Sequence, residues 1–432
     1  MLGIVKKWFG PKANPIGVDF GTDSLKIAQV ALIGNDWRLV AAASADIPTH
    51  VRHEPLARMS FLSQTTRDLL AQGNFSGRNA VLALPAASMF FQHLRLPKMD
   101  DQALKRALPW EARGKIPIDP NHALLRHHVA GTIYQDQEEK LEVIAMAASR
   151  DIVNQYLDVA AKAKLEIVNL NVEPSAIVDC FIHIYLRKSD ADVTNCFVDI
   201  GCTGTRAIIA RGPHILFVRS IPIGGNHLTQ AVATALNLKF YDAKMLRLRL
   251  CALQPSPSDV QRKQEILPPA QEQAAEEFAA LSAALSAAKH ADAHPVDRRA
   301  STLLPEPPAN TQPSEPNHQA ALAEQACREP LAKIVAELDL CRRYHESTFP
   351  SRPVDRLIFI GGEAKHKNLC QYVARELGLA AQVGDPLVRM GRISDISIDS
   401  GIDRRQPQPN WAVAIGLSLG PNKAAAKTAE SP

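Results

Sequence analysis

Apolar and polar residues alternate along the first part of the chain, a pattern typical of β-strands. Residues 15–20 are largely apolar, residues 25–33 resume the alternation after a short polar stretch, and a turn at 34–36 leads into a third alternating segment. These features predict three strands joined by tight turns. Apolar residues then recur at helical spacing over residues 56–71, and residues 79–85 form an apolar run typical of a buried strand. This order of elements predicts an α/β domain.

The same order starts again near residue 196. An apolar strand ends at Asp199, just as the first strand ends at Asp19, and in both places a glycine and small polar residues follow. A second alternating strand then leaves the polar tip. The two aspartates are about 180 residues apart, whereas solenoid repeats have periods of roughly 20–50 residues. The sequence therefore predicts a duplicated domain.

Two segments depart from this repeat. Residues 86–164 read as a strand, a helix beginning at Asp100 and Asp101, a strand pair and a further helix, which predicts an inserted α/β subdomain. Residues 254–325 are rich in Pro, Ala, Gln and Ser and bury too little apolar surface to offset the entropy of ordering, so a disordered insertion with one transient helix is predicted. The predicted organisation is an N-terminal segment (1–14), a first lobe (15–85, continued by 165–190 and 405–420), the inserted subdomain (86–164), a second lobe (191–253, continued by 326–404), the disordered insertion (254–325) and a disordered tail (421–432).

Composition narrows the class of protein. The formal net charge of 432 residues is only +4, with no basic stripe interleaved with aromatic residues, so no nucleic-acid partner is expected. No stretch reaches the ~18 uninterrupted apolar residues of a membrane span, so a soluble protein is expected. The start, MLGIVKKWFG, either dips into a membrane surface or docks on its own domain. The seven cysteines are scattered without a CxxC pair, which indicates buried thiols in a reducing compartment rather than disulfides or a zinc site.

The polar tips after Asp19 and Asp199 carry the candidate chemistry. A glycine after a strand leaves room for a phosphate, and turn amides that point the same way form an anion-binding nest. An aspartate beside such a nest suits Mg²⁺ bound through water, because magnesium keeps most of its hydration shell. Taken singly, each tip is equally an ordinary tight turn, in which Asp and Gly are common. A third glycine turn at Gly361 and Gly362, directly after a predicted strand, favours a phosphate site built from all three.

These motifs, in this order, resemble the actin-like ATPase superfamily, which includes actin, the sugar kinases, the heat-shock chaperones and FtsA. The resemblance rests on GVDFGTDSLKIAQV, VDIGCTGTR, FIGGEAKHKNL and WAVAIGLSLG, and it covers almost the whole chain outside the insertion. Within the superfamily the chain is most similar to the PilM family of type IV pilus assembly, through GTDSLKIAQV, LPKMDDQALKRALPWEARGKIPID, IPIGGNHLT and VDRLIFIGGEA. It implies an α/β fold of two duplicated, actin-like RNase H-like domains around a nucleotide cleft.

The resemblance also implies a role for individual residues. ATP with Mg²⁺ would bind between the lobes, with Asp19 and Asp199 around the metal. The two phosphate faces would be formed by Gly21, Thr22, Asp23 and Ser24, and by Gly201, Thr203, Gly204 and Thr205. Gly361 and Gly362 would pack against adenine and ribose. Lys26 reaches phosphate only if strand alternation turns it inward, and otherwise it is a solvated surface residue. Glu173 would orient the attacking water, although Glu before Pro is also an ordinary helix start.

Three positions depart from the superfamily pattern on the adenosine side. Glu363 stands where a third glycine is usual and places a bulky anion in the path of the nucleotide. Lys244 and Arg247 stand where an acid and a lysine are usual, so a carboxylate that would accept the ribose hydroxyls is missing. We therefore expect a weaker adenosine side beside an intact phosphate side.

The expected function is that of a cytoplasmic ATP-binding scaffold, peripheral at the inner-membrane face. It would hold the N-terminal peptide of a PilN-like inner-membrane protein in a groove beside the inserted subdomain, with slow or no ATP hydrolysis. Pilus motor ATPases are further candidate partners, and membrane contact would be through partners or weakly through the N-terminus. Two alternatives remain: a nucleotide-free interaction module of the same fold, and a small-molecule kinase. A chaperone is disfavoured because no peptide-binding β-domain follows the second lobe.

Overall fold

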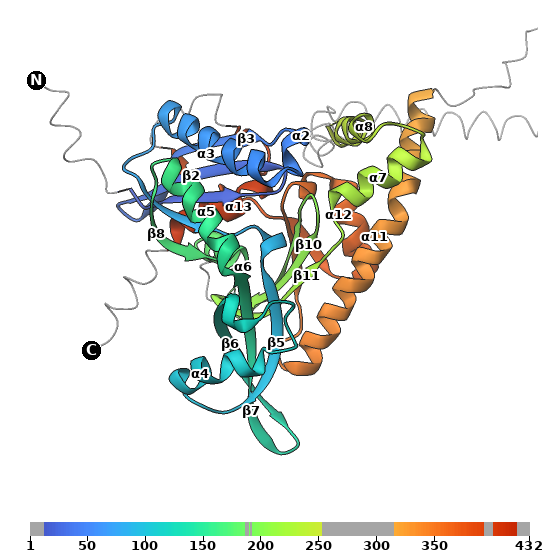
Figure 1. The fold of residues 1–432 in the computed structure, drawn as a ribbon. Coiled ribbons are helices and arrows are strands. Elements are labelled where there is room, and N and C mark those ends of the chain that lie inside the picture. The colour runs from blue at the N-terminus through green and yellow to red at the C-terminus, as the bar shows by residue number, and fades with distance from the viewer. Residues whose placement is uncertain (1–12, 186–189, 191, 253–314, 393–400, 421–432) are drawn as a thin grey trace, which may run out of the picture.

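The computed structural model describes residues 13–185, 190, 192–252, 315–392 and 401–420. Two lobes lie side by side, and a smaller three-stranded sheet lies below them in the view of Figure 1. None of the described helices is long and apolar enough to cross a membrane.

The first lobe is built on a six-stranded sheet. Its strands are β1 (Ile16–Phe20), β2 (Ser24–Ile33), β3 (Asp36–Asp46), β4 (Asn79–Ala83), β8 (Glu166–Asn171) and β14 (Gly391–Arg392). The strand order is β14-β3-β2-β1-β4-β8. Strands β1, β2 and β3 form an antiparallel meander, and β4 and β8 continue the sheet parallel to β1.

The second lobe repeats this arrangement. Its strands are β9 (Thr194–Ile200), β10 (Thr205–Arg211), β11 (His214–Ile221), β12 (Arg356–Ile360) and β13 (Ala380–Val383), in the order β11-β10-β9-β12-β13. Again three antiparallel strands are followed by two parallel ones. The duplication predicted from the two strand–Asp–tip–strand units is therefore confirmed at the level of topology.

Helices cover the sheets where apolar residues recur at helical spacing. The first lobe carries α2 (Thr49–Arg52), α3 (Pro55–Gln72), α5 (Arg150–Lys162), α6 (Glu173–Ile182) and α13 (Ala412–Leu419). The second carries α7 (Gly225–Ala235), α8 (Phe240–Ala252), α11 (Glu315–Thr348) and α12 (Lys367–Leu377). Short 3₁₀ turns lie at η1 (Ala86–Ser88), η2 (Pro120–His122), η4 (Glu363–Lys365) and η6 (Pro409–Trp411). In α3, Leu62, Thr66 and Leu70 recur every four residues and are all buried, which seats one face of the helix on the lobe.

The inserted sheet has the order β5-β7-β6, formed by β5 (Phe90–Pro97), β6 (Ala123–Gln135) and β7 (Glu138–Ser149). It carries α4 (Asp101–Glu111), whose first turn is capped by Asp100, which accepts a hydrogen bond from the Ala103 N–H at 2.7 Å. Helix α5, which falls in the range predicted for the inserted subdomain, packs instead into the core of the first lobe. Its Tyr156 stacks on Phe20 of β1.

Part of the predicted disordered insertion is ordered. Residues 315–325 begin the long helix α11, and Ala323 is fully buried in a small apolar cluster with Val232 of α7 and Ala243 of α8. This helix could not be predicted from its alanine-rich composition, because the face that it buries against α7 and α8 consists mainly of small side chains. Residues 253–314 of the insertion, the N-terminal residues 1–12 and the tail 421–432 lie outside the described residues.

Candidate nucleotide cleft

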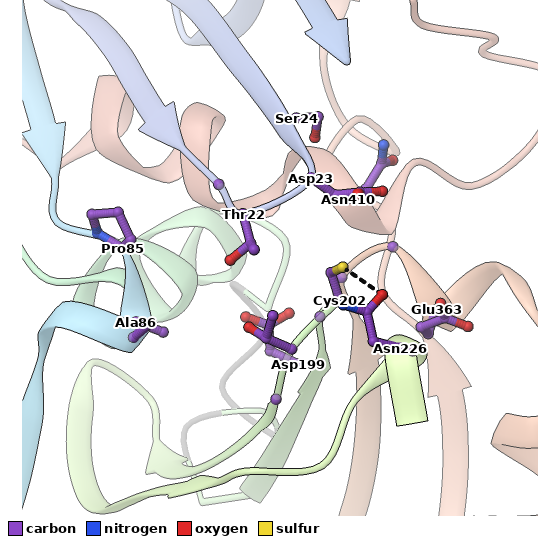
Figure 2. A pocket seen from close by; sticks show the side chains of 18 of the residues that line it. Thr22, Asp23, Ser24, Pro85, Ala86, Asp199, Cys202, Asn226, Glu363 and Asn410 are labelled. Carbon is purple, nitrogen blue, oxygen red and sulfur yellow. Dashed lines mark hydrogen bonds between the residues drawn. The ribbon is translucent and has the colours of Figure 1, made fainter. Parts of the chain in front are cut away.

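Two hairpin tips, residues 21–23 between β1 and β2 and residues 201–204 between β9 and β10, face one cleft. The cleft has a volume of about 1270 Å³ and is lined by both lobes. Thr22 and Asp23 of the first tip and Asp199 and Cys202 of the second lie around it, as Figure 2 shows. The duplicated tips predicted from the sequence are thus brought together.

Nearly all of the residues singled out in the sequence line this cleft. They are Asp19, Gly21, Thr22, Asp23, Ser24, Lys26, Glu173, Asp199, Gly201, Thr203, Gly204, Thr205, Lys244, Gly361, Gly362 and Glu363. Arg247 is buried beside the cleft and does not line it. Lys26 is turned inward by strand alternation: it lies opposite Asp19 in the β1–β2 register. The lining places these residues together, and their individual roles stay predictions.

The glycine turn after β12 closes the cleft from the second lobe. Gly361 has φ +88°, and a Cβ at this position would lie 2.4 Å from Asp199 Oδ1 and 2.6 Å from the Ile200 carbonyl oxygen. Only glycine suits this combination of backbone angle and close approach. Gly362 differs, because a Cβ there would meet nothing within 4 Å. The chain therefore leaves open space beside Gly362, where the resemblance places adenine and ribose.

An arginine that the sequence analysis missed lies at the floor of the cleft. Arg206 is the residue opposite Asp199 in the β9–β10 register, and its guanidinium forms ion pairs with both Asp199 and Glu173. Its Nε also donates to Asp199 Oδ2 at 3.0 Å. A hairpin that closes at the pair Ile200 and Thr205 must set residue 206 beside residue 199, so the register was the signal that could have identified it.

Burial perturbs the charges of this floor. Removal from water raises the pKa of Glu173 to about 8, although the neighbouring Arg206 acts to lower it. Burial also raises the pKa of Asp19, against the opposing effect of Lys26 and Arg206. The guanidinium of Arg206 stays charged, since burial is outweighed by Asp199 and Glu173 and its pKa lies above the usual value. The floor thus combines three carboxyl groups, two of them with raised pKa values, with two cations.

This arrangement does not fit a bound magnesium ion. Mg²⁺ in a nucleotide site takes one or two carboxylates together with phosphate oxygens and water. Asp199 and Glu173 are both engaged by the guanidinium of Arg206, which occupies the position between them. Asp19, the third carboxylate, faces the ammonium of Lys26 on the neighbouring strand.

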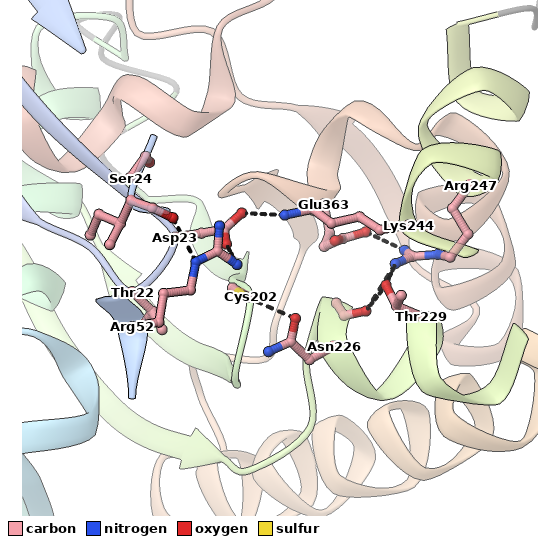
Figure 3. A network of polar contacts seen from close by, with 12 residues as sticks. Thr22, Asp23, Ser24, Arg52, Cys202, Asn226, Thr229, Lys244, Arg247 and Glu363 are labelled. Carbon is pink, nitrogen blue, oxygen red and sulfur yellow. Dashed lines mark hydrogen bonds and ion pairs between the residues drawn. The ribbon is translucent and has the colours of Figure 1, made fainter. Parts of the chain in front are cut away.

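A second polar network spans the mouth of the cleft (Figure 3). Asp23 of the first tip forms ion pairs with Arg52 of α2 and with Lys244 of α8, the latter at 2.7 Å between Nζ and Oδ2. Lys244 therefore links the second lobe to the first through its ion pair with Asp23. Sequence reasoning did not single out Arg52, which carries no local motif.

Arg247 and Glu363, two of the three residues that differ from the superfamily pattern on the adenosine side, form an ion pair with each other. Arg247 donates from Nη2 to Glu363 Oε2 at 2.5 Å, and from Nη1 to Thr229 Oγ1 at 2.7 Å and the Gly225 carbonyl at 2.9 Å. Glu363 lies against the start of α7, where a Cβ on Gly225 would be 2.0 Å from its Oε1. Glu363 thus keeps its bulk in the cleft lining, as predicted, but its charge is paired with Arg247.

A separate groove runs between the edge strand β8 and the inserted sheet. It measures about 420 Å³ and lies on the far side of β4 from the β1–β2 tip. Its lining residues are Leu84, Met89, Leu124, Arg126, Met146, Ala148, Leu157, Ile167, Val168, Asn169, Leu170, Asn171 and Val172. Within the described residues β8 is an edge strand that pairs with β4, so its other edge lies open to a further strand, and Val168 is 53% exposed.

Comparisons with protein families agree with this architecture. The family described as "Type IV pilus assembly protein PilM" matches residues 17–292, and the family "Cell division protein FtsA" matches residues 196–416. A search of curated proteins found no match.

Comparison with solved structures found the same fold. A "PilM-PilN type IV pilus biogenesis complex" is 21% identical, with a TM-score of 0.66, covering 94% of this chain and 98% of that one. The ethanolamine utilization protein EutJ from Carboxydothermus hydrogenoformans is 13% identical with a TM-score of 0.46, covering 95% of this chain and 90% of its own. MreB5 of Spiroplasma citri bound to ADP is 10% identical with a TM-score of 0.43, covering 96% and 98%. The first of these establishes the actin-like fold, and the other two are too distant to add to it.

Proposed function

The chain belongs to the PilM family of type IV pilus assembly proteins, in the FtsA-like part of the actin-like superfamily, and from this premise we propose that it is a nucleotide-binding scaffold of pilus assembly. It binds ATP between its lobes, with slow or no hydrolysis, and docks the N-terminal peptide of a PilN-like inner-membrane protein. It would act at the cytoplasmic face of that membrane, held there through its partner. Pilus motor ATPases are further candidate partners.

One observation carries the nucleotide part of this proposal. Three glycine turns from both lobes, around Gly21, Gly201 and Gly361, converge on a single cleft with open space beside Gly362. Backbone amides at such turns bind anions, and closely approaching glycines admit a phosphate chain. Arg247 pairs with Glu363 and so reduces the electrostatic objection to a nucleotide, which supports the scaffold over the nucleotide-free module. A kinase would additionally need a substrate pocket with its own catalytic base, whereas Glu173, the candidate base, is already paired with Arg206.

Substitution of Gly362 by phenylalanine is expected to abolish nucleotide binding without unfolding the protein. The backbone there has φ −66° and ψ −38°, which any residue adopts, and the open space would be filled by the ring. The measurement is a thermal-shift titration with ATP, in which a ligand at one hundred times its Kd stabilises the wild type by about 2.7 kcal/mol. Gly362→Ala is the matched control, since one methyl group meets nothing within 4 Å. Equal shifts for Phe and wild type would show that the nucleotide does not occupy this cleft.

The groove beside β8 is the proposed site of the partner peptide. An extended peptide can add to an exposed strand edge through main-chain hydrogen bonds while its side chains enter pockets. The edge of β8 and the apolar residues of the inserted sheet, such as Leu124 and Met146, offer both features side by side. The PilM-PilN complex among the similar structures supports a PilN-like occupant.

Val168→Asp is expected to weaken binding of a PilN-type N-terminal peptide at least about tenfold, which is about 1.4 kcal/mol. The change puts a charge on the exposed face of β8 within the groove and should leave stability nearly unchanged, because the side chain is already 53% exposed. Fluorescence anisotropy with a labelled peptide measures the affinity. Val388→Asp, at a valine that is 62% exposed and lies outside the groove, is the matched control. Equal losses in both variants would rule out this groove.

A further inference from the structure

We propose that Arg206 takes the place of the divalent cation in the cleft, so that the chain binds the polyphosphate of its nucleotide without magnesium. This inference rests on the proposed nucleotide binding and goes beyond it by stating the form of the ligand: a metal-free nucleoside triphosphate or diphosphate.

The position of Arg206 is set by the backbone rather than by a mobile side chain. Antiparallel pairing of β9 and β10 places it directly opposite Asp199, and its side chain is only 13% exposed. From there the guanidinium also reaches Glu173, the first residue of α6, which belongs to the other lobe. Arg206 therefore links two carboxylates, one from each lobe, within the cleft that both hairpin tips line.

The acidic side chains at the floor of the cleft favour a cation of the protein itself, such as Arg206, beside them. In their ionised forms the clustered carboxyl groups of Asp19, Asp199 and Glu173 would repel a polyphosphate, and without a neighbouring cation a divalent ion would be needed to offset their charge. Arg206 and Lys26 already place two positive charges beside these carboxyl groups, and burial also raises the pKa of Asp19 and Glu173, which further reduces the negative charge to be offset. A guanidinium remains protonated at every physiological pH and has five N–H donors in a planar fork, which suits carboxylate and phosphate oxygens together.

Magnesium would have to displace this arginine in order to bind. The ion demands nearly octahedral oxygen coordination and gives up its water reluctantly. Displacement would strip Arg206 of Asp199 and Glu173, its two ion-pair partners, and leave a buried guanidinium uncompensated. The same contacts hold Glu173 by ion pairing, which removes it from activation of water and accounts for slow or absent hydrolysis.

The test is a calorimetric titration of the full-length protein with ATP, carried out once with Mg²⁺ and once with excess EDTA. The two dissociation constants are expected to agree within about twofold. A requirement for Mg²⁺ in the wild type would overturn the inference while leaving nucleotide binding intact. Absence of binding under both conditions would instead overturn the proposed nucleotide function and this inference with it. Neither outcome depends on the folding of a variant.

Arg206→Gln extends the test to the residue itself. Removal of the cation leaves Asp199 and Glu173 unneutralised, so ATP affinity in EDTA is expected to fall at least about tenfold and to recover with Mg²⁺. Direct titration with Mn²⁺ should also reveal metal binding to the variant and none to the wild type. Arg211→Gln, on the same strand but outside the cleft and paired with Asp192, is the matched control for loss of one charge. An Arg206→Gln variant that binds ATP equally well in EDTA would contradict the assignment.

Discussion

Replacement of Glu142 by alanine is expected to lower the free energy of unfolding by about 3–5 kcal/mol, the loss typical of removing one partner from a buried ionic network. Glu142 lies on β7 with no solvent exposure. Its Oε1 accepts a hydrogen bond from the Tyr344 hydroxyl at 2.8 Å and lies 2.9 Å from His93 Nδ1, while Oε2 accepts from Arg95 Nε at 3.3 Å. Alanine would leave these groups without their shared partner.

The network fastens the inserted sheet to the second lobe. Glu142 and His93 belong to the inserted sheet, whereas Tyr344 lies on α11, and His93 Nε2 is 3.2 Å from the Val218 carbonyl oxygen of β11. Chemical denaturation measures the expected loss. Glu139→Ala is the matched control on the same strand, because Glu139 pairs with the exposed Lys98 and its loss should change stability little. Equal effects at the two positions would mean that the buried network does not hold the sheet in place.

The same carboxylate gives stability a pH dependence. Burial acts to raise its pKa, but hydrogen bonds from His93 and Tyr344 lower it, and the net shift is below the ordinary value of 4.5. A depressed carboxylate pKa contributes stability that is present above the unfolded-state value and is lost as pH falls through the folded-state value. The unfolding free energy should therefore decline below about pH 4.5, and part of this decline should vanish in Glu142→Gln. An identical slope for both proteins would exclude this contribution.

Gly416→Val is expected to destabilise the protein by about 1–3 kcal/mol or more, the range seen when a well-packed interior is overfilled. Gly416 lies on α13 where this helix crosses α6, and a Cβ there would be 1.8 Å from the Ala176 carbonyl oxygen. Since that atom is backbone, the two helices must move apart. α6 leads from β8 of the first lobe to β9 of the second, so the displacement would also disturb the lobe junction.

Thermal and chemical unfolding of Gly416→Val give the size of this effect. Gly420→Ala provides the comparison at the end of the same helix, because its Cβ would meet first the tip of the Asp179 side chain, at 3.0 Å, which can move aside. We expect Gly420→Ala to be tolerated. Near wild-type stability of Gly416→Val would mean that the close crossing of α6 and α13 is not required for the fold.

Most of the fold could be predicted from local sequence patterns. Period-two alternation around Asp19 and Asp199 was enough to identify both meanders, and the repeat of the tip motif identified the duplication. Turn glycines such as Gly361 could be recognised because a backbone angle and a close approach restrict a single position. The alternation, the tip motif and the strand–glycine turn order are local and can be read from sequence, whereas the close approach of Gly361 to Asp199 becomes visible only in the folded chain.

The beginning of α11 shows where local reading failed. Residues 315–325 contain a single large apolar side chain, Leu322, too few to mark a buried helix, so the composition predicts disorder. Ala323 is nevertheless buried, because α7 and α8 approach closely enough for a methyl group to fill the contact. Burial of small residues depends on neighbours that the local composition does not describe.

The chemistry of the cleft was decided by tertiary structure. Sequence placed Lys244, Arg247 and Glu363 on the adenosine side, but only the packed lobes pair Lys244 with Asp23, 221 residues away, and Arg247 with Glu363, 116 residues away. Arg206 likewise joins Asp199 on its own hairpin to Glu173 on another lobe. The sequence alone determined the two aspartates and the glycine turns that face the cleft, because strand and turn positions are local, whereas Arg52 and Arg206 were recognised only in the packed structure. Their partners depend on distances between elements remote in the chain, and these distances exist only once the two lobes and the helices between them have packed.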